Sequence, residues 1–194
     1  MLAAPMTKAK SHSPSRMTSH IVLLRSINVG NNALKMERLR SICQDLGCAD
    51  VRTYVQSGNL LFSSRDKSSQ LSELIENQLL GETRLPVSVI VKTRAQWKRI
   101  VGGNPFLKAY GVDPKTLHVT FLTKAATKAG LSALAAIESG ADRWHAAADI
   151  IYLHCPKGYG RTKLSNTAIE KKLALRATTR NWTTVQTLYE MAQL

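Results

Sequence analysis

Polar side chains and glycines gather in two short segments in the first third of the chain. Their members are Arg25, Asn28 and Gly30 in one segment and Gln56, Ser57, Gly58 and Asn59 in the other. Guanidinium, amide and hydroxyl groups donate to anions, and glycine lets backbone N–H groups approach a ligand. The same residue types also serve ordinary turns, by adopting left-handed backbone or capping it locally. The segments therefore predict a ligand site, with plain turn chemistry as the alternative.

A second, more basic cluster occurs near the end of the chain and predicts an anion-binding site. Its members are Lys157, Arg161, Lys163, Arg180, Asn181 and Trp182. Cations, flexible glycine backbone and an aromatic ring are typical of phosphate sites. The alternative is structural: Thr162 and either Thr179 or Asn181 could cap helices, and Trp182 could be buried.

Catalytic and metal-binding patterns are weak. His118 and His154 lie in expected strands with no carboxylate at motif spacing, which favours structural histidines. Cys43 and Cys48 lack the spacing of a metal or redox pair, and Cys155 precedes a proline. We therefore expect no metal site and no cofactor, and whether the protein is an enzyme stays open.

The net charge of +14, from 27 basic and 13 acidic residues, is unevenly distributed. Residues 83–194 hold seventeen basic and six acidic residues, a net +11, whereas residues 17–82 are neutral. Such a field attracts polyanions, so nucleic acid or a phosphate-bearing ligand is the expected partner, with a merely solvated surface as the alternative. No apolar run could cross a membrane, and three cysteines, an odd number, favour the reducing cytoplasm.

Hydrophobic periodicity predicts the elements that must position these clusters. In the first half we expect strands at residues 20–26, 51–56, 59–63 and 86–92 and helices at 35–46 and 68–81. This β-α-β-β-α-β order is typical of a ferredoxin-like unit. Its right-handed crossover makes the first two strands parallel. Both polar segments should therefore lie at one end of the sheet.

The second half shows a similar order, β-α-β-β-α, so the expected fold is α+β with two related subdomains. After a helix at 94–101 we expect strands at 117–122, 143–147 and 150–154 and helices at 127–137, 162–173 and 181–192. Residues 1–19 read as a disordered basic tail. The expected subdomains are then 20–103, which is ferredoxin-like, and 104–194, with a break at Gly102-Gly103-Asn104-Pro105.

Several motifs resemble those of the bacterial family catalogued as domain of unknown function 1697, in the right order over residues 20–192. They are Leu23 to Gly30, Val51 to Asn59, Asn104-Pro105-Phe106, Leu117 to Leu122, Tyr159 to Leu164 and Thr178 to Trp182. The chain departs from the usual motif, which has glycine at the positions of Ser26 and Asn31. The resemblance implies an α+β fold with a ferredoxin-like N-terminal portion in a soluble bacterial protein, and it implies no activity.

Three hypotheses about function follow. The first is binding of an anionic ligand, nucleic acid or a phosphorylated small molecule, through the basic second half. The second is an enzyme of unknown reaction with its site at the Arg25–Gly30 and Gln56–Asn59 loops. The third is a structural or partner-binding module, which an exposed apolar patch around Trp97 or Trp144 would favour.

Overall fold

The computed structural model describes residues 17–25, 27, 34–56, 58–84, 86–108 and 111–194. The expected tail falls outside these ranges up to residue 16, and the first strand already begins at Thr18. In the first half the elements are β1 (Thr18–Arg25), α1 (Met36–Asp45), β2 (Ala49–Tyr54), β3 (Asn59–Ser64), α2 (Ser68–Thr83), β4 (Ser88–Thr93) and α3 (Arg94–Gly102).

The second half repeats this order of elements after two short 3-10 turns, η1 (Pro105–Lys108) and η2 (Pro114–Thr116). Its elements are β5 (Leu117–Leu122), α4 (Lys128–Ala135), β6 (Arg143–Ala147), β7 (Ile150–His154), η3 (Tyr159–Arg161), α5 (Asn166–Leu173), β8 (Ala177–Asn181) and α6 (Trp182–Met191). Each half is therefore β-α-β-β-α-β-α.

The two antiparallel sheets have the same strand order, which confirms the α+β class and the ferredoxin-like first half. The orders are β2-β3-β1-β4 and β6-β7-β5-β8. In each sheet the first and third strands of the half lie at the centre. The sequence prediction was incomplete in the second half, because it treated Ala177–Asn181 as a loop. This segment is the edge strand β8, paired with β5 from His118↔Asn181 to Leu122↔Ala177.

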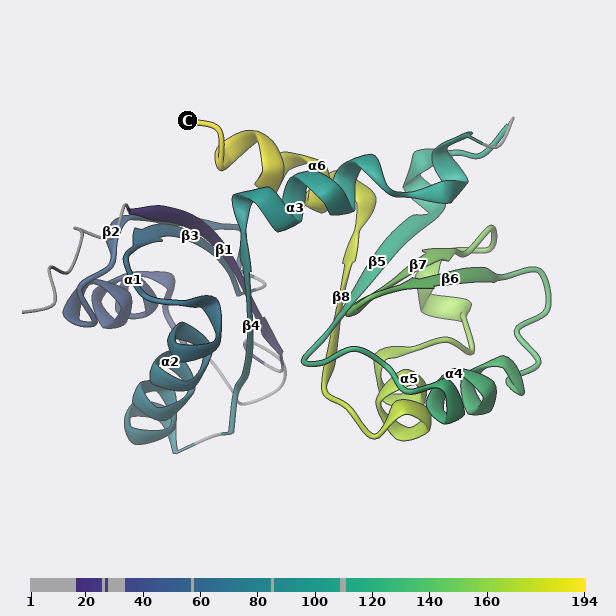
Figure 1. Ribbon diagram of the computed structural model, residues 1–194, viewed down its shortest axis with the longest axis horizontal. Coiled ribbons are helices and arrows are strands. Elements are labelled where there is room, and N and C mark those ends of the chain that lie inside the picture. Colours follow the sequence, from purple (N-terminus) through teal and green to yellow (C-terminus); the bar gives the residue numbers. More distant parts are fainter. Residues whose placement is uncertain (1–16, 26, 28–33, 57, 85, 109–110) are drawn as a thin grey trace, which may run out of the picture.

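Helices cover the outer face of each sheet, and the two inner faces are turned toward each other (Figure 1). Residues of α1 and α2 form one core with the outward side chains of the first sheet. Residues of α4 and α5 do the same for the second sheet. Amphipathic helices over one face of a sheet are the expected way to bury the alternating apolar residues of its strands.

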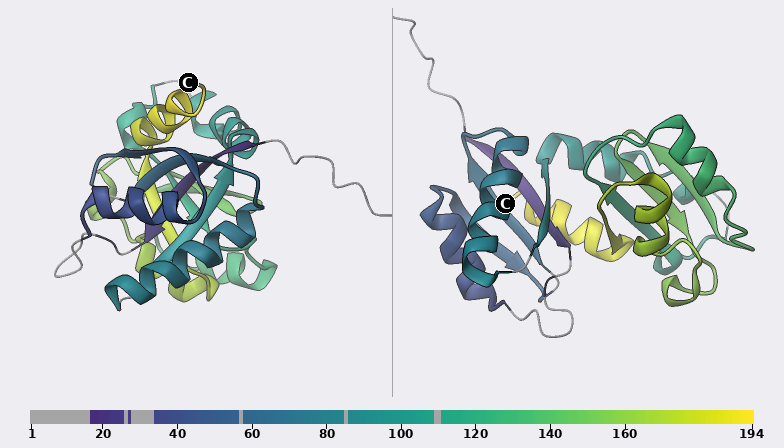
Figure 2. Two further views of the ribbon diagram at one scale, coloured as in Figure 1. Left: turned by 90° about the vertical axis from the view of Figure 1, so that its left-hand side faces the viewer. Right: turned by 90° about the horizontal axis from the view of Figure 1, so that it is seen from below.

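A third core joins the two halves, with α3 and α6 lying between the sheets (Figures 1 and 2). It contains Ile21, Leu23 and Ile90 from the first sheet and Val119 and Phe121 from the second. The indole of Trp97 in α3 stacks on Phe121 at 4.8 Å between ring centroids, and its Nε1 donates to the carbonyl of Val185 in α6 at 2.9 Å. The expected units 20–103 and 104–194 share this core, and the boundary between them stays a proposal.

Two polar contacts tie the halves at equivalent positions of the repeat. Lys92 and Arg180 each precede the residue that caps the next helix, Thr93 for α3 and Asn181 for α6. Lys92 reaches across to Asp149 in the β6–β7 turn, with Nζ 2.5 Å from Oδ2. Arg180 reaches across to Asn59 at the β2–β3 turn, with Nε 2.6 Å from Oδ1. Each half thus bonds to a hairpin of the other half, β6–β7 in one case and β2–β3 in the other.

Some boundaries differ from the sequence prediction for local reasons. Helix α2 continues past Gly81 to Thr83 and is capped by Arg84, a left-handed residue with φ 57°. Helix α5 begins at Asn166 with Ser165 as its cap, not at residue 162. The Thr162 hydroxyl donates to Asp142 at 2.6 Å and accepts the N–H of Leu164 at 3.0 Å, both outside the helix. Within the described ranges, no helix is both long and apolar enough to span a bilayer.

Candidate functional site

The end of β1 and the β2–β3 turn lie side by side, as the crossover rule predicts. Leu23 pairs with Asn59 in the sheet, and the N–H of Leu24 donates to the Gly58 carbonyl at 2.8 Å. Gln56 lies exposed at the same turn. Three further predicted members, Asn28, Gly30 and Ser57, lie outside the described residues.

Gly58 has a packing role that the sequence did not reveal. Its φ is +71°, and a Cβ there would lie 2.5 Å from Ile27 Cγ2 and 2.8 Å from Leu24 Cβ. These contacts leave no space for a side chain on the side where Cβ would point. The glycine is therefore needed for the close approach of the turn to β1.

Arg180 joins the two clusters that the sequence presented separately. Its Nη2 donates to the Leu24 carbonyl at 3.1 Å, in addition to the bond from Nε to Asn59. Its Nη1 donates to Thr178 Oγ1 at 2.7 Å and to the Thr179 carbonyl at 3.0 Å. Burial, and then the nearby charge of Arg25, lower the pKa of Arg180 to about 10. The site therefore concentrates positive charge in a poorly solvated place.

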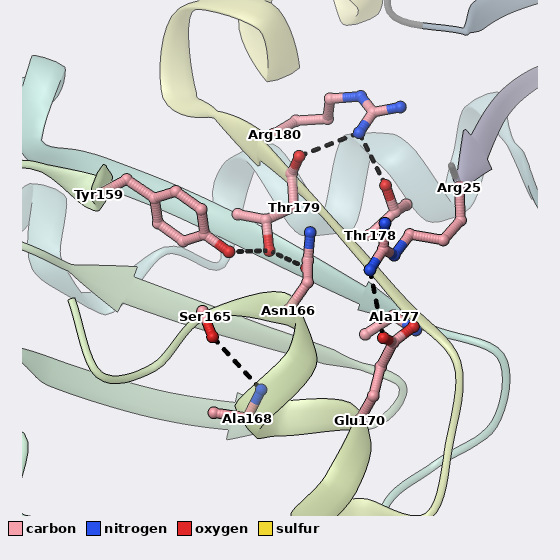
Figure 3. Close-up of polar contacts among 10 residues, drawn as sticks. All are labelled: Arg25, Tyr159, Ser165, Asn166, Ala168, Glu170, Ala177, Thr178, Thr179 and Arg180. Carbon is pink, nitrogen blue, oxygen red and sulfur yellow. Dashed lines mark hydrogen bonds and ion pairs between the residues drawn. The ribbon is translucent and has the colours of Figure 1, made fainter. Parts of the chain in front are cut away.

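Arg25 reaches past the edge of β8 to Glu170 on α5 (Figure 3). Arg25 Nη2 lies 3.3 Å from Glu170 Oε2, and the two side chains are 26% and 14% exposed. The other carboxylate oxygen of Glu170 accepts the N–H of Ala177 at 3.0 Å, which fixes the carboxylate at the start of β8. Glu170 was not among the predicted residues, because a lone glutamate on a helix has no sequence signal.

A chain of hydroxyl groups lies on the face of β8 opposite to Arg180, and Figure 3 draws its members Tyr159, Thr179 and Asn166. Tyr159 Oη donates to Thr179 Oγ1 at 3.1 Å, and Thr179 in turn donates to Asn166 Oδ1 at 2.7 Å. The Thr120 hydroxyl is 2.7 Å from the same oxygen of Thr179. Burial raises the pKa of Tyr159, although its bond to Thr179 opposes this effect. Tyr159 also stacks on His118 at 4.9 Å between ring centroids.

We call these groups together the junction cluster, because both halves and both faces of β8 contribute to it. Its members are Arg25, Asn59, Thr120, Tyr159, Asn166, Glu170, Thr178, Thr179 and Arg180. Strand β8 contributes three of the nine, on both of its faces, because alternate residues of a strand point to opposite faces. Thr178 and Arg180 face the other half of the molecule, whereas Thr179 faces α5 and η3.

Lys157, Arg161 and Lys163 lie on the exposed turn that carries Tyr159. Within the described part of the chain, these three side chains make no ion pair. Tyr159, the residue between the first two, is anchored to β8 through Thr179. The basic turn is thereby held beside the junction cluster.

Asn181 and Trp182 take the structural roles that were weighed as alternatives. Asn181 Oδ1 accepts the N–H of Thr184 at 2.7 Å and caps α6. Trp182 is 1% exposed and belongs to the core between the sheets. Trp182 is therefore shielded from a ligand at the surface, whereas Asn181 is exposed.

Thiol and metal chemistry receive no support from the described residues. The three cysteines are free and buried. Burial raises the pKa of Cys43 to about 12 and the pKa values of Cys48 and Cys155 to about 11, so all three are protonated and unreactive near neutral pH. No three His, Cys, Asp or Glu side chains gather as a metal would require, as far as the described ranges extend.

Comparison with known proteins identifies a family and a similar solved structure. None of the curated proteins matches it significantly. A solved structure of a conserved bacterial protein from Streptococcus pneumoniae is similar, with a TM-score of 0.71 and 22% identity over 92% of this chain and 100% of that one. At this identity the likeness shows the fold alone. The model of a protein family of unknown function, DUF1697, matches residues 17–152, and the chain belongs to that family.

Proposed function

We propose that the protein binds a phosphate-bearing anion where the basic turn of Lys157, Arg161 and Lys163 meets Arg25 at the junction cluster. The observation that carries the proposal is the convergence of two guanidinium groups from different halves, Arg25 and Arg180. Burial, and to a smaller extent the charge of Arg25, lower the pKa of Arg180. Glu170 offsets one of the two charges. An anion at this place would relieve the remaining repulsion and gain charge-assisted hydrogen bonds.

A phosphorylated small molecule suits this geometry better than a base-stacked nucleic acid. Sheets of this topology bind RNA by stacking bases on the face that carries no helices. Here that face is buried in both sheets, because residues such as Leu23 and Val119 form the core between them. Nucleic acid could therefore contact only the outer basic surface, through its phosphates.

The test compares two triple variants of equal net charge. Lys157→Gln/Arg161→Gln/Lys163→Gln removes the basic turn, whereas Lys98→Gln/Lys124→Gln/Lys128→Gln removes three exposed lysines of α3 and the α4 region. Pyrophosphate binding, measured by calorimetry at about 50 mM salt, should weaken roughly tenfold in the first variant only, because each lost cation removes a charge-assisted bond. Equal weakening in both would show that net charge alone attracts the anion, and absence of binding to the unmodified protein would refute the proposal.

A parallel measurement with a 20-nucleotide single-stranded RNA decides the nucleic-acid form. Fluorescence anisotropy across a salt series gives the number of phosphates neutralised, with about 0.7 units of log–log slope for each. If RNA is the ligand, the basic-turn variant should lose about two units of slope. If both variants show the same log–log salt slope, RNA binding is due to unspecific electrostatic attraction.

The two alternative functions have less support among the described residues. For an enzyme, Glu170 and Tyr159 are the junction groups able to move a proton, and both are already hydrogen-bonded. For a partner-binding module, Trp97 is fully buried and Trp144 packs against the core of the second sheet. We place the protein in the cytoplasm in this proposal, which the three free cysteines support.

A further inference from the structure

A cavity of about 400 Å³ opens between the halves beside the ion pair of Lys92 and Asp149. Its floor is apolar and consists of Ile100, Ile150 and the ring of Tyr152, all buried. The Tyr152 hydroxyl donates to the Ile100 carbonyl at 2.9 Å. The volume is in the range of small-molecule sites, and an apolar floor with a few polar groups is their usual composition. The cavity shares no residue with the junction cluster.

Three hydrogen-bond donors line the same cavity. Lys92 is 5% exposed, and its ammonium has three N–H groups, of which one meets Asp149. The Gln96 carbonyl oxygen is occupied by the N–H of Thr93 at 2.8 Å, which leaves its amide N–H groups for another partner. Arg99 is exposed, and its guanidinium makes no ion pair within the described residues.

Helix geometry places two of these donors together. Gln96 and Arg99 are three residues apart on α3, so they share the face that borders the cavity. With Lys92 and Arg99 against Asp149, the charged groups of the lining carry a net +1. On the far side of the ion pair a second cavity of about 390 Å³ is lined by Glu73 and Glu76, so that side repels an acid.

We propose that the cavity beside Lys92 binds a small organic anion with an apolar body. The apolar body lies on Ile100, Ile150 and Tyr152. The acid group receives hydrogen bonds from Arg99 and Gln96, supported by Lys92. This function is additional to the proposed phosphate site and does not depend on it.

The test uses a matched pair of dyes, 8-anilinonaphthalene-1-sulfonate and its uncharged analogue N-phenyl-1-naphthylamine. The sulfonate should bind with a stoichiometry of one and at least about fivefold more tightly than the analogue, because only the sulfonate can use the three donors. Arg99→Gln should weaken sulfonate binding by about fivefold and leave the analogue unchanged. Lys98→Gln is the control, since Lys98 is exposed on the same helix but does not line the cavity.

A second variant tests the location by filling the cavity. Ala147 lines the cavity and is only partly buried, so Ala147→Leu adds bulk there without replacing a buried core residue. Thermal unfolding would show that the fold is retained, and binding of both dyes should then be lost. Equal effects of Arg99→Gln and Lys98→Gln, or binding that survives Ala147→Leu, would overturn the proposal. The basic-turn triple variant should bind the sulfonate as the unmodified protein does, which separates this site from the phosphate site.

Discussion

At the scale of single residues, the polar signature of the first half serves two purposes at once. Arg25 and Asn59, which were predicted to bind a ligand, both contact the second half directly. Gly58, from the same motif, is explained by packing against Leu24 and Ile27. A single sequence motif can therefore contain both residues that contact the other half of the molecule and residues that hold these contact residues in position.

Replacement of Gly58 by alanine should be strongly destabilising. The new Cβ would overlap Ile27 and Leu24, and the residue would keep a left-handed φ of +71°. Strain of both kinds costs about 2–4 kcal/mol of unfolding free energy, measurable by urea denaturation.

Gly81→Ala is the matched control for this measurement. No atom lies within 4 Å of the position that its Cβ would take, and the residue is inside α2. Alanine should raise the stability there by about 0.5–1 kcal/mol, because it is the better helix former. Similar losses in the two variants would contradict the packing role of Gly58.

At the scale of elements, helix α6 depends on its capping residue. Asn181→Ala should lower the unfolding free energy by about 1 kcal/mol, since the N–H of Thr184 loses its acceptor. Asn181→Asp should retain most of the stability, because an aspartate oxygen caps equally well.

The same two variants distinguish capping from anion binding. If Asn181 only caps α6, pyrophosphate affinity should be the same in Asn181→Ala as in the unmodified protein. A loss of affinity larger than about threefold in the folded variant would return Asn181 to the binding site.

Most elements could be predicted because their apolar residues follow a helical or strand period. Strand β5 and the hairpin of β6 and β7 were predicted with their observed bounds. Strand β8 was missed, because Thr178, Thr179 and Arg180 are polar on both faces. One face bonds the other half and the other face bonds Tyr159 and Asn166. Such a segment becomes a strand only through its contacts with residues distant in the sequence, and the local sequence pattern does not indicate those contacts.

At the scale of the whole molecule, the meeting of the two halves explains why the candidate site could be predicted only in part. Strand topology was enough to bring Arg25 near Asn59. It gave no indication that Arg180, some 120 positions later, would bond Asn59. The cavity beside Lys92 was not predicted either, since it depends on how α3 of the first half lies against the β6–β7 hairpin of the second half.

Stability should fall as the pH is lowered from about 7.5 to 5.5. Burial lowers the pKa values of His20, His118 and His154 below 6.5, so the unfolded chain takes up protons before the folded one does. The stability that these groups contribute is present above pH 6.5 and is lost below it, by up to about 1.4 kcal/mol per pH unit for each histidine.

Chemical unfolding at several pH values measures this dependence. His20 should contribute clearly, because its ring is 1% exposed and its Nε2 has no hydrogen-bond partner within the described residues. His20→Gln should flatten the pH dependence, whereas His145→Gln, at an exposed position, should not. Stability independent of pH in this window would contradict the assignment.

The equivalent placement of Lys92 and Arg180 has a consequence for how the chain can vary. The two halves have the same order of helices and strands, and each contacts the hairpin of the other. This is the arrangement of a two-fold dimer whose subunits are covalently joined. In a true homodimer, any substitution at one of two symmetry-related contacts appears at the other as well. In a single chain the two contacts between the halves can diverge. One contact is therefore made by Lys92, beside an open cavity. The other is made by Arg180, which is bound to amide, hydroxyl and carbonyl groups.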